Sequence, residues 1–314
     1  MIRCLFRAAR VPGAPAPYDT LHARVYYPAL APDSEAERLS GELPVDRSRA
    51  PLPVVLFCSG INIPCAGYGW LAMRLARTGL VTVLYDYVAE TLPGVIGLTP
   101  GLDLARVRPP TYGSGPTCPA LRPLFELLRE LNDRPDSPLH AALDLNAVAL
   151  GGHSAGGTVA LHNGGYFAAV LAVFAYAGHT VASTLLGFPP DTVLPIADKP
   201  TLLMRGDRDG VIAASRGRYG HGAAEDPVAR TFAEALPATA RGPLYEAVIV
   251  GANHLAIVHP QDETTGRAFL DGDPGRPTEA LRQTIADLIT AFLNRHVCRR
   301  PVTIGADHVF LRFR

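Results

Sequence analysis

The segment Gly151-Gly152-His153-Ser154-Ala155-Gly156-Gly157 decides the fold that we expect for this chain. It follows the apolar run 146–150, which is typical of a buried strand, and it precedes residues 158–161, which can continue as a helix. A serine on a sharp turn between a strand and a helix has a strained backbone that holds its hydroxyl clear of the sheet. Glycines on both sides let neighbouring segments approach without a Cβ clash. The sequence therefore predicts a nucleophile elbow, Gly-x-Ser-x-Gly, with Ser154 as the nucleophile.

The composition favours one large domain over residues 1–314. Hydrophobic residues make up 48% of the 314 positions, which is enough for a substantial core. Charged residues make up 18%, with 29 basic and 29 acidic side chains, so no net field attracts nucleic acid or anionic lipid. We therefore expect the partner to be a small neutral or apolar molecule.

Neither a disulfide framework nor a targeting segment is expected. The five cysteines are odd in number, widely scattered, and without the paired spacing of a zinc site. Arginines interrupt the apolar residues of 1–10 before a signal-peptide core can form, and no apolar stretch is long enough for a membrane span. The sequence predicts a cytoplasmic protein that needs no metal or cofactor, and it leaves the oligomeric state open.

Apolar runs and helical patterns alternate along the chain. Because a strand, a helix and a second strand form a right-handed crossover, successive strands of this kind are parallel. The pattern predicts an α/β fold, a doubly wound and mostly parallel sheet flanked by helices. Buried strands are expected at 53–58, 80–85, 146–150, 168–175, 201–205 and 246–250, edge strands at 2–6, 22–26 and 302–314, and helices at 67–78, 120–132 and 278–296.

Residues 86–119 interrupt this alternation. They are rich in Gly, Pro and Thr and have little periodicity. Because a loop of this length inside a compact domain is usually functional or mobile, we expect a loop or cap excursion. It either lines the mouth of a pocket or decorates the surface, and the residues alone do not choose between the two.

An aliphatic hydroxyl needs a base within hydrogen-bond reach, and the base needs a carboxylate that orients it. His254 is the predicted base because it follows a predicted strand on a Gly-Ala-Asn turn, and His259 is the second choice. Asp207 and Asp209 both follow the strand that ends at Arg205, so spacing alone leaves the choice of acid open. Asp207 could also be a turn former.

Acyl transfer further requires N–H donors that face the oxyanion, and the loss of one donor typically costs about 3 to 4 kcal/mol. Ala155 supplies one N–H by following the nucleophile, and Ile61, on the turn 59–62 after a strand, is predicted to supply the other. A simple turn at the end of the strand is the alternative.

Residues close to this predicted oxyanion turn are expected to contact the substrate. Asn62, Ile63 and Tyr68 are the predicted substrate-binding residues, although the apolar side chains among them could belong to the core. His153, inside the elbow, is expected to point beneath the turn as a packed, hydrogen-bonded structural residue.

These motifs together resemble the α/β-hydrolase superfamily over nearly the whole chain, from about residue 18 to residue 296. The segments 56–62 and 152–157 look most like the dienelactone-hydrolase-related esterases, which include chlorophyllases, platelet-activating-factor acetylhydrolase-like enzymes and bacterial polyester hydrolases. In this superfamily the acid lies three residues after the glycine that ends a strand, here Gly206. The resemblance therefore implies that Asp209 is the acid, in the triad order Ser154, Asp209, His254.

The chain also departs from each of these groups. Dienelactone hydrolases proper have cysteine at the elbow, where this chain has Ser154. Secreted polyester hydrolases carry a signal peptide and usually a disulfide near the carboxyl end, and chlorophyllases commonly have another residue in place of Ala155. The resemblance thus implies a serine esterase without specifying its substrate.

The sequence predicts a serine carboxylic-ester hydrolase that forms a covalent acyl-enzyme through Ser154. A lipid-ester or chlorophyll-ester hydrolase and an acyltransferase are alternatives on the same fold. A further alternative is a non-catalytic binding protein on a hydrolase scaffold, because a fold does not dictate activity.

Overall fold

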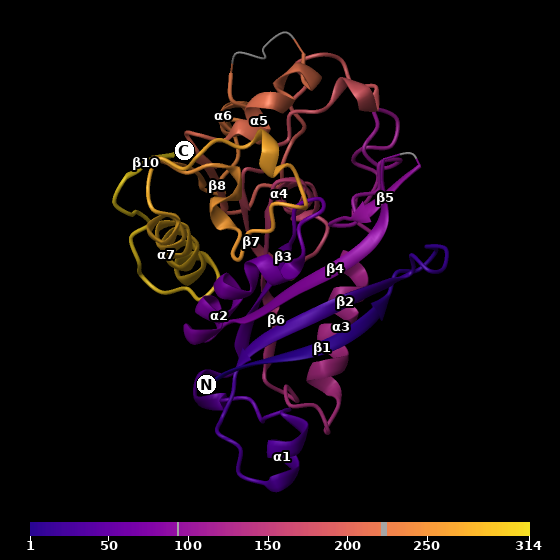
Figure 1. Cartoon of the computed structure of the whole chain (residues 1–314), viewed down its shortest axis with the longest axis vertical. Helices are drawn as coiled ribbons and strands as arrows, with labels where there is room; N and C mark the ends of the chain where they lie inside the picture. Colours follow the sequence, from indigo (N-terminus) through magenta and orange to yellow (C-terminus); the bar gives the residue numbers. More distant parts are fainter. Residues whose placement is uncertain (93, 221–224) are drawn as a thin grey trace.

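A central sheet runs through the molecule (Figure 1). The computed structural model describes residues 1–92, 94–220 and 225–314. The central strands pair with one another in parallel, so their carboxyl ends meet at the same edge. They are β3 (Leu52–Cys58), β4 (Val81–Leu92), β6 (Leu143–His153), β7 (Val170–Tyr176), β8 (Thr201–Gly206) and β9 (Leu244–Ile249).

Antiparallel strands extend the sheet on both sides. The strands β1 (Ile2–Arg10) and β2 (Thr20–Pro28) form a hairpin that pairs with β4, and β10 (Val309–Phe313) pairs with β9. Over the described residues, the strand order is β1-β2-β4-β3-β6-β7-β8-β9-β10. The predicted α/β fold with a mostly parallel sheet is therefore confirmed, and antiparallel strands lie at the predicted edges.

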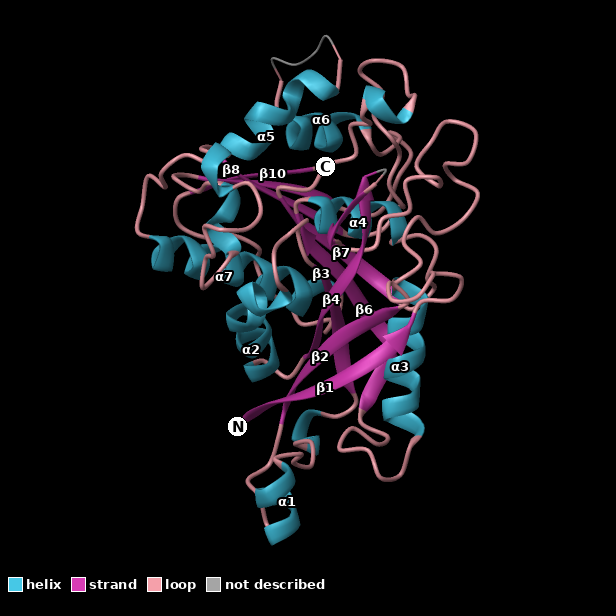
Figure 2. Cartoon of the chain, turned by 45° about the vertical axis from the view of Figure 1, so that its right-hand side comes forward, coloured by secondary structure: helices cyan, strands magenta, loops and turns pink. Residues whose placement is uncertain are grey.

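Helices cover both faces of the sheet (Figure 2). Residues of β3 alternate between two apolar clusters, because successive side chains of a strand point to opposite faces. The helices α2 (Gly69–Arg77) and α7 (Thr278–His296) contribute to one cluster. The other receives α3 (Leu121–Asp133), α4 (Ala155–Asn163) and α6 (Pro227–Glu234). The shorter helices are α1 (Glu35–Ser40), α5 (Gly210–Ser215), and the 3₁₀ helices η1 (Arg47–Arg49), η2 (Cys65–Tyr68), η3 (Thr184–Leu186), η4 (Arg216–Arg218), η5 (His254–Ile257) and η6 (Ala268–Leu270).

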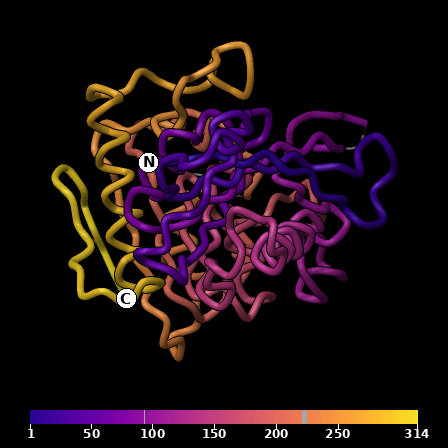
Figure 3. The backbone as a smooth tube through the Cα atoms, turned by 90° about the horizontal axis from the view of Figure 1, so that it is seen from below, coloured from indigo at the N-terminus to yellow at the C-terminus, as the bar shows by residue number. Residues whose placement is uncertain are grey.

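Amphipathic spacing predicts the long helices to within a few residues. In α3 the apolar spacing within 120–132 predicts a stripe of Leu121, Leu124, Phe125, Leu128 and Leu131, of which the four leucines are buried and Phe125 is partly buried. In α7 the predicted range 278–296 is the observed one. Figure 3 shows α7 on one side of the molecule and the tip of the β1–β2 hairpin on the other.

The prediction of an irregular loop from residue 86 is wrong for its first part. Strand β4 continues to Leu92 and pairs with β5 (Val95–Leu98) in an antiparallel hairpin. Beyond Tyr87, β2 no longer pairs with β4, and β5 supplies the backbone partners in its place. Gly and Pro in this stretch obscured the strand pattern.

The remainder of this segment packs against another loop. Val107 lies in a small apolar cluster with Ala182, Phe188 and Leu194, and the Tyr112 hydroxyl donates to the Pro195 carbonyl at 3.2 Å. Side chains thus cover irregular backbone on both segments. None of the helices in the described ranges has both the length and the apolar character that a membrane crossing needs.

Candidate active site

Ser154 lies on a sharp turn between β6 and α4, as predicted. Its φ of 55° and ψ of −124° are rare for a residue with a side chain. Two hydrogen bonds hold this backbone: Ser154 N–H donates to Tyr176 O at 2.8 Å, and Thr158 N–H donates to Ser154 O at 3.0 Å. Ser154 is half-buried, whereas the three elbow residues before it are buried. The turn therefore presents the serine at the carboxyl edge of the sheet.

The elbow glycines are required by close backbone contacts. A Cβ added at Gly152 would overlap the backbone of Gly156 and Gly157. A Cβ added at Gly156 would overlap the carbonyl groups of Cys58 and Ser59, at the end of β3. The start of α4 thus packs directly on the turn that follows β3.

We expect Gly156→Ala to lower the free energy of unfolding by about 1 to 3 kcal/mol, because the added methyl group must displace backbone atoms. Gly217→Ala is the matched control, since a Cβ at Gly217 meets nothing within 4 Å and Gly217 is not among the glycines of positive φ. Urea unfolding followed by circular dichroism measures both. Equal midpoints for the two variants would contradict the requirement for glycine.

An acid and a base meet at the ends of two neighbouring strands. Asp209 follows β8, His254 follows β9, and Asp209 Oδ2 lies 2.8 Å from His254 Nδ1. Both side chains are only 4% exposed. Because an ionised carboxylate only accepts, this bond places the proton on Nδ1 and leaves Nε2 as an acceptor. The pair can therefore take a proton from a hydroxyl that faces Nε2.

Asp209 is held in place by its position at the start of α5. Its Oδ1 accepts the Ile212 N–H at 2.8 Å, so the same carboxylate caps the helix and bonds the imidazole. Asp207 has another partner, because its Oδ1 accepts the Gly251 N–H at 2.7 Å on the turn after β9. His259 is exposed, and its backbone N–H donates to Gly67 O. The structure thus brings Asp209, rather than Asp207, to His254.

His153 lies beneath the elbow, as predicted. It is fully buried, its Nδ1 lies 2.8 Å from the Tyr68 hydroxyl, and its ring centroid is 4.6 Å from that of His254. Burial, and secondarily the charge of His254, hold the pKa of His153 well below its usual range. His153 is therefore neutral near pH 7, and its contact places the His254 ring beside the residue that precedes Ser154.

Both predicted oxyanion donors lie at this edge. Ile61 follows the end of β3, against which Gly156 packs, and Ala155 is the first residue of α4. Within the part of the chain that the structure describes, neither the Ile61 nor the Ala155 backbone N–H donates a hydrogen bond. Both N–H groups are thus available as donors at this edge of the sheet, and their role as an oxyanion hole stays a prediction.

The three predicted substrate contacts have different surroundings. Tyr68 is fully buried, and its hydroxyl accepts the Gly60 N–H at 3.1 Å besides contacting His153. The ring of Tyr68 is part of the core and its hydroxyl bonds the turn at Gly60, so its predicted substrate contact stays a prediction. Ile63 lines a cavity of about 140 Å³ with Leu255 and other, mainly apolar, residues, where a substrate contact stays a prediction.

Asn62 connects the turn 59–62, which carries Ile61, to the β4–β5 hairpin. Its backbone N–H donates to Leu98 O at 2.9 Å, and its side-chain Oδ1 accepts the Leu98 N–H at 3.0 Å. Its φ of 55° is compatible with asparagine better than with most side chains. The hairpin that the sequence did not reveal therefore supports the turn that carries Ile61.

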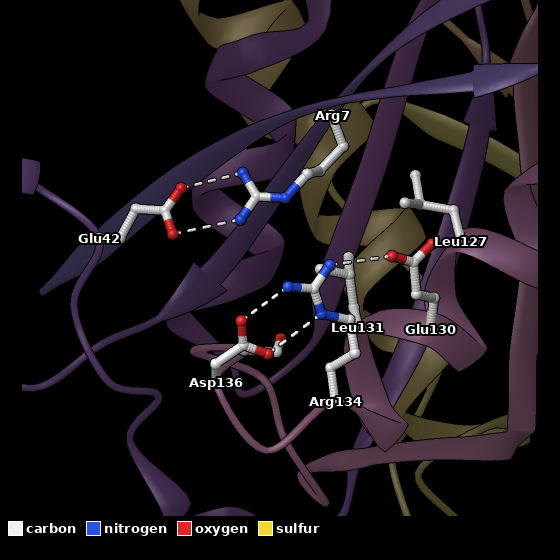
Figure 4. Close-up of a pocket in the computed structure, with 8 residues that line it drawn as sticks. Arg7, Glu42, Leu127, Glu130, Leu131, Arg134 and Asp136 are labelled. Carbon is white, nitrogen blue, oxygen red and sulfur yellow. Dashed lines mark hydrogen bonds and ion pairs between the residues drawn. The ribbon is translucent and has the colours of Figure 1, made fainter.

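Other cavities lie among the described residues, and one of about 480 Å³ is lined by Asn253, Leu255 and Asp271 among others. One of about 180 Å³ lies between β1 and the last turn of α3 (Figure 4). Its charged residues pair with one another: Arg7 pairs with Glu42 at 2.9 Å, and Arg134 pairs with Asp136 at 2.6 Å and with Glu130 at 3.3 Å. Among the described residues, no group of three or more His, Cys, Asp or Glu side chains is arranged to hold a metal ion.

Comparison with known proteins supports the fold. The chain is similar to a solved ferulic acid esterase from Streptomyces cinnamoneus, with a TM-score of 0.61 and 17% identity. The similarity covers 99% of this chain and 94% of that chain. No protein-family profile and no curated protein sequence matches the chain. At this level of identity the likeness shows a shared fold and no more, so the esterase subgroup stays a prediction.

Proposed function

We propose that this chain is a serine carboxylic-ester hydrolase. The observation that carries the proposal is the 2.8 Å hydrogen bond between Asp209 and His254, which follow neighbouring strands. The imidazole of His254 packs against His153, the residue before Ser154 in the elbow. A strained serine, an oriented imidazole and a buried carboxylate together form the constellation that activates a hydroxyl. The fold shared with an esterase agrees with it.

In the proposed reaction Ser154 Oγ attacks the ester carbonyl while His254 Nε2 accepts its proton. The N–H groups of Ile61 and Ala155 stabilise the oxyanion. His254 then returns the proton to the leaving alcohol, which departs and leaves an acyl-enzyme. Water attacks this acyl-enzyme with His254 again as the base, and His254 returns that proton to Ser154 Oγ as the carboxylic acid is released. Asp209 orients the imidazole and stabilises its protonated form.

An uncharged ester suits the surroundings of this site. The cavity beside Ile63 is lined mainly by apolar side chains, which favours an apolar acyl or alcohol group. The Streptomyces neighbour is named a ferulic acid esterase, and an ester of ferulic acid is also a carboxylic ester. A lipid ester, a chlorophyll ester or transfer to an alcohol would use the same first half-reaction.

A fluorophosphonate probe tests the proposal directly. We expect it to phosphonylate the wild-type protein at Ser154 alone, because the base and the oxyanion donors activate only this hydroxyl. Mass spectrometry of the digested protein locates the label, which should be absent from Ser154→Ala and present in Ser114→Ala, whose serine is exposed and lies outside the elbow. Folded wild-type protein that fails to react would instead favour the non-catalytic binding protein.

A further inference from the structure

A second carboxylate, Asp271, touches the loops of both the acid and the base. It follows η6, and it is half-buried. Its Oδ1 accepts the backbone N–H of Gly210 at 3.2 Å and that of His254 at 3.1 Å. Its Oδ2 accepts the N–H of Leu255 at 2.9 Å. No motif in the sequence marks Asp271, which lies 17 positions after His254.

These three donors belong to the two loops that must be aligned. Gly210 directly follows Asp209, whereas His254 and Leu255 start the 3₁₀ helix after β9. The Asp209–His254 bond joins the loops through side chains, and Asp271 joins them again through backbone. A residue next to Asp271 adds another tie, because Asn253 Nδ2 donates to Gly272 O at 2.7 Å.

We propose that Asp271 is a positioning residue for the Asp209–His254 pair, and this inference rests on the proposed esterase function. Asp271 holds the two loops in a fixed relative position, so that the His254 imidazole keeps its orientation while the ring takes and returns a proton. Its negative charge also lies close to the imidazolium that forms in each half-reaction. Because an opposite charge stabilises a cation, Asp271 acts on the reaction through His254.

The charged and titratable groups around His254 predict how the removal of Asp271 changes the pH dependence of the reaction. Asp209 and Asp271 are the carboxylates in contact with His254, while His153 and His179 are buried and neutral and the Tyr176 hydroxyl donates to Asn253 O. Burial raises the pKa of Asp271, while the N–H groups of Leu255 and His254 and the charge of His254 oppose the shift. The carboxylate and the protonated imidazole therefore attract each other.

The test compares Asp271→Asn with Asp273→Asn, which removes the same charge from an exposed carboxylate two positions away. For Asp271→Asn we expect a kcat for p-nitrophenyl acetate about 10- to 100-fold lower with KM within about twofold, because misplacement of a catalytic group acts on the chemical step. The acid limb of the kcat/KM profile should move to lower pH, since His254 loses a neighbour that favours its protonation. Asp273→Asn should change neither.

Equal effects of the two variants, or an Asp271→Asn variant with wild-type kcat and acid limb, would overturn the inference. If Asp271→Asn does not fold, Asp271→Glu decides: it keeps the charge but displaces the acceptors, so a reduced kcat with an unmoved acid limb supports positioning and an unchanged kcat refutes it. If the wild-type protein hydrolyses no ester, the proposed esterase function itself is rejected. If the enzyme is active, depends on Ser154 and keeps its activity in Asp271→Asn, only the inference about Asp271 is rejected.

Discussion

Replacing Ser154 with alanine is expected to lower kcat for p-nitrophenyl acetate by about 10⁴- to 10⁶-fold. Alanine removes the only hydroxyl on the elbow turn and with it the acyl-enzyme, so that just the oxyanion donors and substrate binding remain. The turn itself should survive, because its two backbone hydrogen bonds, to Tyr176 and from Thr158, do not use the serine side chain. Initial rates and thermal melts of the same preparations give both quantities.

Residual activity should be compared with that of Ser114→Ala, which changes an exposed serine outside the elbow whose hydroxyl donates to Thr111 O. That control should retain the wild-type rate. If Ser154→Ala hydrolyses the ester as fast as the wild type, the proposed mechanism is rejected. A Ser154→Ala variant that melts far below the wild type would require the probe-labelling result to decide the role of the serine.

Asp209→Asn is expected to lower kcat/KM by about 10³- to 10⁴-fold. An amide at this position still caps α5 through its oxygen, but it no longer favours the protonated imidazole or the tautomer with the proton on Nδ1. The loss should therefore appear in the chemical step, with the fold retained. The pH dependence of kcat/KM, followed with p-nitrophenyl acetate, measures it.

Asp207→Asn is the matched control, since both carboxylates follow the strand that ends at Arg205 and residue spacing alone does not choose between them. Its oxygen can still accept the Gly251 N–H, so kcat/KM should stay within about threefold of the wild type. A large loss for Asp207→Asn with little loss for Asp209→Asn would show that the acid had been assigned to the wrong aspartate.

Local patterns were sufficient for the sheet and the elbow. Period-two and continuous apolar runs mark buried strands, and the spacing of Leu121, Leu124, Leu128 and Leu131 marks a helix that buries one side. The elbow is predictable because only glycine fits where α4 packs on the end of β3. These features depend on neighbours in sequence or on steric limits that hold in any fold.

Other features depend on partners distant in sequence. The extension of β4 needs β5 as its partner, and Pro93 and Gly94 between them read as a loop. Tyr68 was predicted to contact substrate because it lies close in sequence to the predicted oxyanion turn. The packing of η2 instead places its hydroxyl against the backbone N–H of Gly60. Asp271 carries no signal at all, because its donors are backbone N–H groups that any residue type supplies.

The amino-acid sequence by itself determined the α/β order, the strained turn at Ser154, and the strand ends from which an acid and a base emerge. Residue spacing left two aspartates open and the family resemblance implied Asp209, but only the tertiary structure placed its carboxylate against His254 and revealed the third carboxylate, Asp271. The physical reason is that hydrophobic periodicity specifies which faces are buried, whereas a hydrogen bond of 2.8 Å depends on the helix cap that directs the Asp209 side chain.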